Sequence, residues 1–417
     1  MSRPAGAGRS SAKAQESGAG GSFDHHDPRF VEDPESVIGP LREECPLVRS
    51  DLYGGFWVLT RYDDVTRAAL DHESFTSAVV GTTVIPPSQP RTYPLLPIEL
   101  DPPQHAVYRG LVNALFSKPR IESLRPELET LATRLLEPLA RDGRGDVMSG
   151  FANPMSLGAL ARFMNLPEED EERWFDWVER MFANALLDKE DQAEAVRAAE
   201  AYIDTLIDER KQQPKDDFLG MLLEAEVDGH RLSDLEVRQF GVLMLLAGYE
   251  TTSGAMGLSL LHLAQHPELR VQLFADPAAL AHSAVNELLR YISPVQVFCR
   301  NAAHDLDLHG ETVPAGDIVL LAYGAANHDP RAFPHPDRCV LDRHPNRHVA
   351  FGHGRHLCLG ANLARLELTI MIERFAALFP DFRLDPEHPP TWKPRGDIRG
   401  LATLDVLGPP APLTAPA

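Results

Sequence analysis

The chain has 417 residues, with 40 Lys and Arg against 61 Asp and Glu, which gives a formal net charge of −21 at pH 7. This negative charge opposes binding to nucleic acid or to an anionic membrane surface, because both kinds of contact need clustered basic residues. Length alone favours about two or three domains, since domains usually have roughly 100–200 residues.

The use of cysteine and of apolar residues indicates a cytoplasmic protein that does not bind a membrane. The four cysteines (Cys45, Cys299, Cys339 and Cys358) are far apart and form no CxxC pair, which suits a reducing compartment. The most apolar stretch, residues 240–249, is about half the length of the roughly 20 residues that a bilayer requires. No apolar segment typical of a secretion signal is present near residue 1.

The first half of the chain contains more helical patterns than strand patterns. Residues 1–22 are rich in Gly, Ala and Ser, which predicts a disordered tail. β-Branched and aromatic residues behind a Gly-Gly turn predict a strand over residues 54–62. Residues 76–103 are rich in Pro and Thr and have no helical period, which predicts a long loop. Apolar residues at helical spacing then predict helices over residues 122–140, 174–181 and 196–207.

The second half is dominated by one long apolar helix. Ser233 and Glu236 form a capping-box pattern, from which a helix of roughly 32 residues and 48 Å extends to about Gln265. Its centre, residues 247–254, contains two glycines and β-branched polar residues, which form helix poorly. Either tight packing at the glycines or a functional requirement explains this composition.

The remaining elements complete a fold that is mainly α with small peripheral β-sheets. A helix is predicted over residues 279–291, strands over residues 295–300 and 318–323, and a final long helix over residues 361–378.

The segment FGHGRHLCLG, residues 351–360, places Cys358 directly before a predicted helix. Backbone N–H groups and the positive end of the helix dipole are expected to lower the pKa of such a thiol and to favour a metal-binding thiolate. A buried structural cysteine is the commoner alternative. A zinc site is another, because His344, His348, His353 and His356 lie nearby, but no second cysteine completes a zinc-ligand spacing.

The same segment resembles the haem-binding loop of the cytochrome P450 monooxygenases. The resemblance implies a cytochrome P450 fold, with the long central helix over a haem b and with Cys358 as the thiolate ligand of its iron. It also implies cofactor-binding roles for the residues around the cysteine: Phe351, Gly352, His356 and Gly360. Because matching segments occur in order along the chain, we expect a single domain over residues 23–407 and a Pro-rich tail over residues 408–417.

Two further motifs match the family on the helices. Glu287 and Arg290 match its ExxR element, which implies a buried pair whose arginine meets residues 333–338. Residues 247–251 are similar to the oxygen-activation motif, which implies that Glu250 relays protons and that the Thr251 hydroxyl hydrogen-bonds the oxygen being activated. Tyr249 departs from the family, many bacterial members of which have His here, and we expect it to alter the roof of the pocket.

A fourth match concerns the haem propionates. His105 and Arg109 are spaced i, i+4 and therefore share a helix face. The resemblance implies that they bind the propionates together with Arg300 and His356, since buried carboxylates need donor partners.

The family further implies an enzyme that inserts one oxygen atom of O₂ into a small hydrophobic substrate, such as a terpenoid or another natural-product intermediate. Hydroxylation is the default, while epoxidation, demethylation and ring coupling are alternatives. A non-catalytic haem sensor is disfavoured by the Glu250–Thr251 pair. By family position, the substrate pocket is lined by these residues: Val84, Ile85, Leu95, Leu96, Ala247, Val295, Val297, Phe298 and Leu401.

No flavin module or dinucleotide-binding fingerprint is visible in the sequence. Electrons are therefore expected from NAD(P)H through external partners, a [2Fe–2S] ferredoxin and its reductase. We expect the ferredoxin to dock on the cysteine side of the haem, near Arg347 and Arg355.

Overall fold

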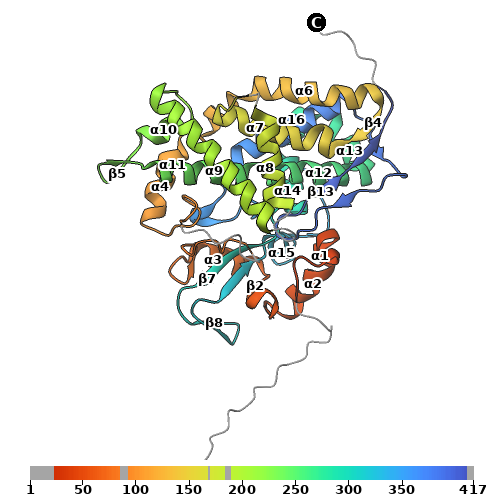
Figure 1. The fold of residues 1–417 in the computed structure, drawn as a ribbon. Helices are drawn as coiled ribbons and strands as arrows, with labels where there is room; N and C mark the ends of the chain where they lie inside the picture. The colour runs from red at the N-terminus through yellow and green to blue at the C-terminus, as the bar shows by residue number, and fades with distance from the viewer. Residues whose placement is uncertain (1–22, 85–92, 168–169, 184–188, 411–417) are drawn as a thin grey trace, which may run out of the picture.

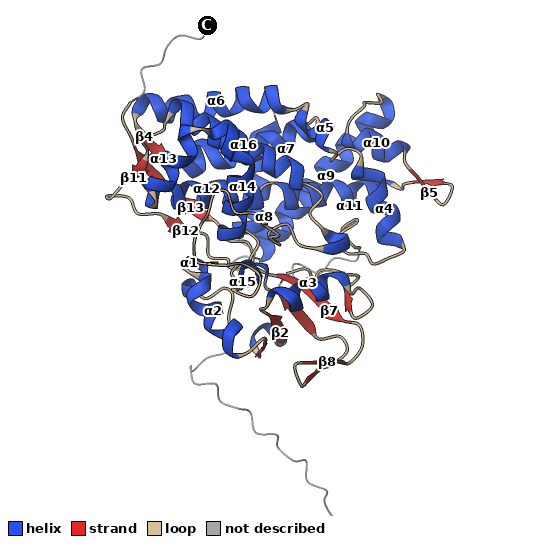
Figure 2. Ribbon diagram, turned by 180° about the vertical axis from the view of Figure 1, so that it is seen from behind, coloured by secondary structure: helices blue, strands red, loops and turns tan. Residues whose placement is uncertain are grey.

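Helices form most of the molecule, and the largest sheet lies at one end of it (Figures 1 and 2). The computed structural model describes residues 23–84, 93–167, 170–183 and 189–410. The predicted tail over residues 1–22, and residues 411–417 of the second tail, lie outside the described residues. The prediction of a mainly α fold with small sheets is confirmed.

The α-helices of the first half are α1 (Pro28–Glu32), α2 (Pro34–Glu44), α3 (Tyr62–Leu70), α4 (Gln104–Asn113), α5 (Lys118–Glu122), α6 (Arg125–Asp142), α7 (Asn153–Met164), α8 (Glu171–Ala183) and α9 (Lys189–Gln212). Those of the second half are α10 (Phe218–Glu224), α11 (Asp234–Gly248), α12 (Glu250–Gln265), α13 (Pro267–Ala275), α14 (Pro277–Ile292), α15 (Tyr323–Asn327) and α16 (Ala361–Leu378). The predicted helices over residues 122–140, 174–181, 279–291 and 361–378 therefore correspond to α6, α8, α14 and α16.

The strands are short. They are β1 (Leu47–Ser50), β2 (Phe56–Leu59), β3 (Phe75–Thr76), β4 (Arg144–Asp146), β5 (Glu226–Val227), β6 (His230–Arg231), β7 (Phe298–Ala302), β8 (Leu306–Leu308), β9 (Glu311–Val313), β10 (Ile318–Leu321), β11 (Arg383–Leu384), β12 (Thr391–Trp392), β13 (Leu401–Thr403) and β14 (Asp405–Leu407).

The largest sheet joins the beginning of the chain to residues near 300 and 320. Its strand order is β1-β2-β10-β7-β3, with β10 parallel to β2 and antiparallel to β7. All four residues of β2 are buried, as expected for an unbroken apolar strand that is covered on both faces. The predicted strand over residues 54–62 is thus shorter than expected, because helix α3 already begins at Tyr62.

The helical body contains two large apolar clusters. One involves α6, α12, α14 and α16, and the other involves α7, α8, α9, α10 and α11. Helix α12 thus packs in the first cluster and α11 in the second, so the two halves of the predicted long helix link the clusters. Figure 1 shows both helices in green, with α11 toward the left of the helical body beside α9 and α12 toward the right.

The predicted long helix is interrupted at Tyr249, where α11 ends and α12 begins. Ser156 Oγ on α7 lies within hydrogen-bond distance of the carbonyl oxygens of Gly248 (3.2 Å) and Tyr249 (3.0 Å), so it partners carbonyl groups at the break. A Cβ on Gly248 would lie 3.1 Å from Leu160, which shows that close packing also contributes to the glycine. The predicted capping box at Ser233 and Glu236 is confirmed.

Within the described residues, none of the helices combines the length and the apolar composition needed to span a bilayer.

Candidate cofactor and substrate site

A large cavity of about 410 Å³ lies where four distant parts of the chain meet. Its lining includes His105 from α4, Thr251 from α12, Arg300 from β7 and Cys358 from the loop before α16. Because these side chains share one cavity, the structure brings together segments that sequence reasoning had connected only through their motifs.

The loop that carries Cys358 is fixed by close backbone packing. The Cys358 amide donates to the Phe351 carbonyl at 2.8 Å, which closes the loop. Gly354 has φ +72°, and a Cβ there would lie 2.8 Å from the carbonyl oxygen of Ala69. This glycine is therefore required by both its conformation and its surroundings. The Cys358 side chain is exposed to the cavity rather than packed into the core.

The expectation that local backbone groups lower the pKa of Cys358 is wrong as a net result. Burial raises the pKa of this thiol, and the Gly360 N–H and the guanidinium groups of Arg109 and Arg365 offset only part of the increase. The backbone of Gly360 does lower the pKa of the thiol, but the larger effect is desolvation, which depends on the tertiary structure.

Four donor side chains gather on one side of the cavity. The rings of His105 and His356 lie 4.3 Å apart, and both belong to the cavity lining with Arg109 and Arg300. The Nε2 atoms of both histidines are buried and have no hydrogen-bond partner within the described part of the chain. The arginines are anchored by carbonyl groups, Arg109 by Leu357 and Arg300 by Cys299, at 2.6 Å each.

The electrostatics of this cluster suit a dianionic ligand. Burial, reinforced by nearby cations, lowers the pKa of His105 to about 4 and that of His356 to about 2. Two neutral imidazoles and two guanidinium groups therefore offer donors without any carboxylate among them. The propionates of haem b fit this arrangement, with Cys358 as a sulfur ligand in the same cavity.

The two residues of the predicted oxygen-activation motif face different surroundings. Thr251 lines the cavity, and its hydroxyl donates to the Ala247 carbonyl at 2.9 Å. Glu250 is 2% exposed and is not among the lining residues; it contacts Arg395 at 3.3 Å and Lys393 at 3.4 Å. Burial raises the pKa of Glu250, and these two cations lower it in part. Arg395 itself lines the cavity, so it connects the buried acid with the cavity wall.

Tyr249 lies outside the cavity lining, which corrects the expectation that it shapes the roof directly. Its side chain is fully buried, packs against the Phe175 ring at 5.9 Å and donates from its hydroxyl to Glu179 on α8. Tyr249 therefore contacts helix α8 and adjoins Gly248, which does line the cavity.

The cavity wall beyond these groups is largely apolar. Of the predicted substrate-contacting residues, six line it: Val84, Leu95, Ala247, Val295, Val297 and Phe298. Leu96 and Leu401 are not among the lining residues; both are buried in apolar clusters. Ile85 lies outside the described residues.

Sequence reasoning missed several lining residues that it had treated as helix core or had not singled out. They are Phe163, Met181, Val242, Leu243, Met244, Glu367 and Arg395. The helical period places the apolar residues on a buried face, but it does not distinguish a packed core from a cavity wall. Glu367 is buried with Oε2 unpartnered, and burial raises its pKa well above the ordinary value.

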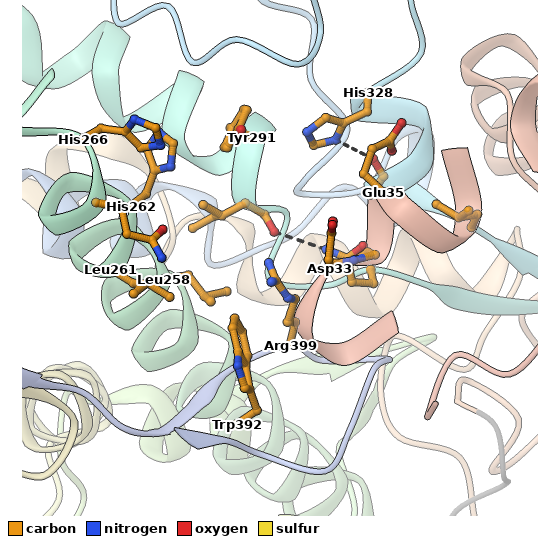
Figure 3. Close-up of a pocket in the computed structure, with 16 residues that line it drawn as sticks. Asp33, Glu35, Leu258, Leu261, His262, His266, Tyr291, His328, Trp392 and Arg399 are labelled. Carbon is orange, nitrogen blue, oxygen red and sulfur yellow. Dashed lines mark hydrogen bonds between the residues drawn. The ribbon is translucent and has the colours of Figure 1, made fainter. Parts of the chain in front are cut away.

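A second cavity, of about 270 Å³, lies between α2, α12 and α14 and shares no lining residue with the first (Figure 3). Its wall carries a row of rings, in which His262 lies 4.4 Å from His266 and 4.6 Å from Tyr291. Its charged groups already have partners in the fold: Glu35 pairs with Arg42, and Arg399 donates to backbone carbonyls. It therefore lacks the open cluster of donors that marks the first cavity.

Across the described residues, no group of three or more His, Cys, Asp and Glu is arranged to hold a metal ion. His348, one residue of the zinc alternative, instead has its Nε2 3.2 Å from Oδ1 of Asn286.

Comparison with known proteins agrees with this geometry. The family model described as "Cytochrome P450" matches residues 158–276 and 279–402. "Polyketide biosynthesis cytochrome P450 PksS" of Bacillus subtilis is 34% identical over 92% of this chain and 98% of its own length. "Mycinamicin IV hydroxylase/epoxidase" of Micromonospora griseorubida is 36% identical over 88% and 94%. The structure of CYP109Q5 from Chondromyces apiculatus superposes with a TM-score of 0.85 at 30% identity, covering 94% of this chain and 99% of its own.

Proposed function

This chain belongs to the cytochrome P450 family of haem-dependent monooxygenases, and we propose that it hydroxylates a small hydrophobic substrate such as a terpenoid or another natural-product intermediate. The observation that carries the proposal is one cavity that combines a cysteine, a donor cluster, Thr251 and an apolar wall. The names of two relatives, which refer to polyketide biosynthesis and to a hydroxylase/epoxidase, support natural-product oxidation.

The chain's own groups would divide the work as follows. Cys358 would ligate the iron of haem b, while His105, Arg109, Arg300 and His356, which line the same cavity, would bind its propionates. When bound, the haem supplies the iron at which O₂ is activated, one oxygen atom entering the substrate and the other leaving as water. The apolar wall orients the substrate and excludes water from the site.

Proton supply is assigned to the two motif residues on α12. The Thr251 hydroxyl lies in the cavity, where it can donate a hydrogen bond in place of the one that it makes to the Ala247 carbonyl. Glu250 is buried behind it and holds or releases a proton next to Lys393 and Arg395. A general acid–base group of this kind typically contributes about 10²–10⁴-fold to a rate.

The experiment that tests the proposal is a spectral titration of the haem-loaded protein with terpenoid, polyketide and small aromatic panels, followed by product analysis. We expect apolar compounds of one class to shift the Soret band and to give a product with one added oxygen atom. An epoxide, a demethylated product or a coupled ring would replace hydroxylation with that oxidation. Ligand binding without any product, with electrons supplied, would favour the non-catalytic haem sensor.

We expect Thr251→Ala to separate NADH consumption from product formation. Without the hydroxyl the protein keeps its cavity but loses a hydrogen-bond donor, so the product formed per NADH should fall on the order of tenfold or more while peroxide accumulates. Thr251→Ser, which retains the hydroxyl, should stay close to the wild type. Full product yield per NADH in the alanine variant would remove Thr251 from the mechanism.

We further propose that electrons come from NAD(P)H through a ferredoxin reductase and a [2Fe–2S] ferredoxin that docks beside the Cys358 loop. The support is that Arg347 and Arg355 are both exposed next to this loop, in a chain whose net charge is −21. The four free cysteines suit the cytoplasm that we propose for such a system.

Reversing both charges, Arg347→Glu with Arg355→Glu, should slow reduction by an acidic ferredoxin about tenfold at low salt, because surface charges steer association. The difference should shrink as salt is added. Stopped-flow reduction of the CO-saturated protein measures this, with Arg141→Glu on α6 as a control, because Arg141 is exposed and belongs to neither the cysteine loop nor the cavity lining. Equal reduction rates for all variants would place the docking surface elsewhere.

A further inference from the structure

The buried acid Glu250 belongs to a network of charges that reaches helix α8, which contributes Met181 to the cavity wall. Lys393 Nζ lies 3.4 Å from Glu250 Oε1 and 3.4 Å from Glu179 Oε1, so one ammonium group serves two carboxylates. Arg395 contacts Glu250 at 3.3 Å and Asp397 at 2.6 Å. Two cations are thereby shared among three carboxylates.

The two ends of this network differ in burial. Glu250 is 2% exposed and Asp397 3%, whereas the side chain of Glu179 is 29% exposed. The charge of Glu250 is therefore costly, and it is offset by the contacts that this carboxylate makes with Arg395 and Lys393. Glu179 is partly open to solvent.

Tyr249 connects the network to helix α8. Its hydroxyl donates to the same carboxylate, Glu179, that Lys393 contacts, and Lys393 Nζ lies 5.8 Å from the Tyr249 ring centroid. Glu179 thus has a neutral donor as well as a cation. Without the tyrosine hydroxyl, Lys393 would be the remaining side-chain contact of Glu179 among the described residues.

Helix α8 also touches the cavity. Met181, two residues after Glu179 on this helix, lines the cavity wall. Helix α8 therefore lines the cavity through Met181 and, through Glu179, contacts Lys393, which also contacts the proposed proton-relay acid Glu250.

We propose that Lys393 is a positioning residue that sets the charge of Glu250, and that Tyr249 and Glu179 control how much of Lys393 is available to it. If α8 moves toward Lys393, the contact of Lys393 with Glu179 strengthens and its contact with Glu250 weakens. If α8 moves away, Lys393 interacts mainly with Glu250. The state of the cavity roof is thereby coupled to proton supply. The inference rests on the proposed role of Glu250 as the proton relay.

Infrared spectroscopy of the haem-loaded resting protein tests this without turnover. The carboxylic-acid C=O band of Glu250, identified by its loss in Glu250→Gln, is followed as the pH is raised. The groups that face this acid are Lys393, Arg395, Asp397 and Glu179, with His25 and His26 acting on Asp397.

In Lys393→Met we expect the midpoint for loss of the band to rise by at least about one pH unit, a tenfold change in the proton dissociation constant, because a nearby positive charge favours the ionised form. Lys393→Arg should restore the wild-type midpoint. Glu179→Gln should lower it, since a negative neighbour is removed and Lys393 is left to Glu250. Unchanged midpoints in both Lys393→Met and Glu179→Gln would overturn the proposal.

Tyr249→Phe tests the connection to α8. We expect a higher midpoint, because Glu179 then competes harder for Lys393, together with faster amide hydrogen exchange over α8. Tyr108→Phe is a matched control, since it also removes a tyrosine–glutamate hydrogen bond, to Glu236. It should change neither measurement, and equal effects in the two variants would contradict the specific role of Tyr249.

These outcomes are separate from the proposed function. If no compound is oxidised but the midpoints shift as expected, the network stands and the monooxygenase proposal fails. If oxidation proceeds and the midpoints stay fixed, the monooxygenase proposal stands and the network proposal fails.

Discussion

Cys358→Ser is expected to abolish oxidation while leaving the fold intact. Serine is nearly isosteric with cysteine, but its hydroxyl is a poor replacement for a soft thiolate ligand. Loss of an outer-shell partner of a metal ligand usually costs 10–100-fold in metal affinity or activity, so loss of the ligand itself should exceed about a hundredfold. The side chain lies at the cavity surface, so the exchange leaves the apolar core untouched.

The spectrum of the reduced, CO-treated protein provides the direct measurement. The wild type should show the Soret position of thiolate ligation, and the serine variant should lose it. Cys45→Ser is the matched control, because Cys45 is exposed and is not among the residues that line the cavity. A thiolate-type spectrum that survives in Cys358→Ser would assign the ligand to another of the three cysteines.

The expected band also bears on the raised pKa of the thiol. Burial favours the neutral form of Cys358, whereas the Gly360 N–H and the guanidinium groups of Arg109 and Arg365 favour the thiolate. A bound metal cation adds a much larger positive charge at the sulfur and reverses this balance. The raised pKa of Cys358 in the protein without haem is therefore compatible with thiolate ligation in the haem-loaded protein.

The helices were the part of the fold most accessible from sequence. Helix α16 occupies the predicted residues, because its apolar period starts immediately after a glycine that ends the cysteine loop. Helices α6 and α14 agree for the same reason, since each has an apolar face several turns long. Such patterns are local, and they do not depend on where the rest of the chain lies.

The partners of Glu250 show what sequence could not provide. Lys393 and Arg395 are more than 140 residues away in the chain and belong to a segment with no distinctive pattern. Leu96 and Leu401 failed as pocket residues for a related reason: a loop or short strand has two sides, and only the tertiary structure selects the one that faces the cavity.

Tyr249 is a position that the sequence identified but whose contacts it did not predict. Its motif identified the position as unusual, yet the direction of its side chain depends on the break between α11 and α12 and on Glu179 from another helix. A departure from a family pattern therefore located a feature of interest without revealing its contacts.

The ion pair between Glu287 and Arg290 on α14 should be the structural element near the cysteine loop whose substitution destabilises the protein most. Arg290 donates to Glu287 through Nε and one terminal nitrogen, at 2.9 Å each, and both side chains are fully buried. Arg290 also donates to the carbonyl groups of Asn327, Pro336 and Arg338 at 2.8–3.0 Å. The predicted meeting of this arginine with residues 333–338 is confirmed.

Arg290→Met is therefore expected to destabilise the protein by roughly 3–5 kcal/mol, because it leaves a buried carboxylate with one cation fewer and three carbonyl groups without their donor. Total stabilities are typically about 5–15 kcal/mol, so much of the variant should fail to fold or to retain haem. Glu287 keeps Arg343, whose Nε lies 3.0 Å from both carboxylate oxygens, which limits the loss.

Urea unfolding of the haem-loaded protein, monitored in the Soret band and by circular dichroism, measures the effect as a lower midpoint. Lys211→Met is the matched control: it breaks the exposed pair with Asp234 and should cost well under about 1 kcal/mol. The double variant Arg290→Met with Glu287→Leu should lose less than the sum of the single variants, since both charges of this pair are removed together, while Arg343 loses its carboxylate partner in Glu287→Leu and in the double variant alike. An unchanged midpoint in Arg290→Met would show that neither the pair with Glu287 nor the hydrogen bonds from Arg290 to the three carbonyl groups determine the stability of this region.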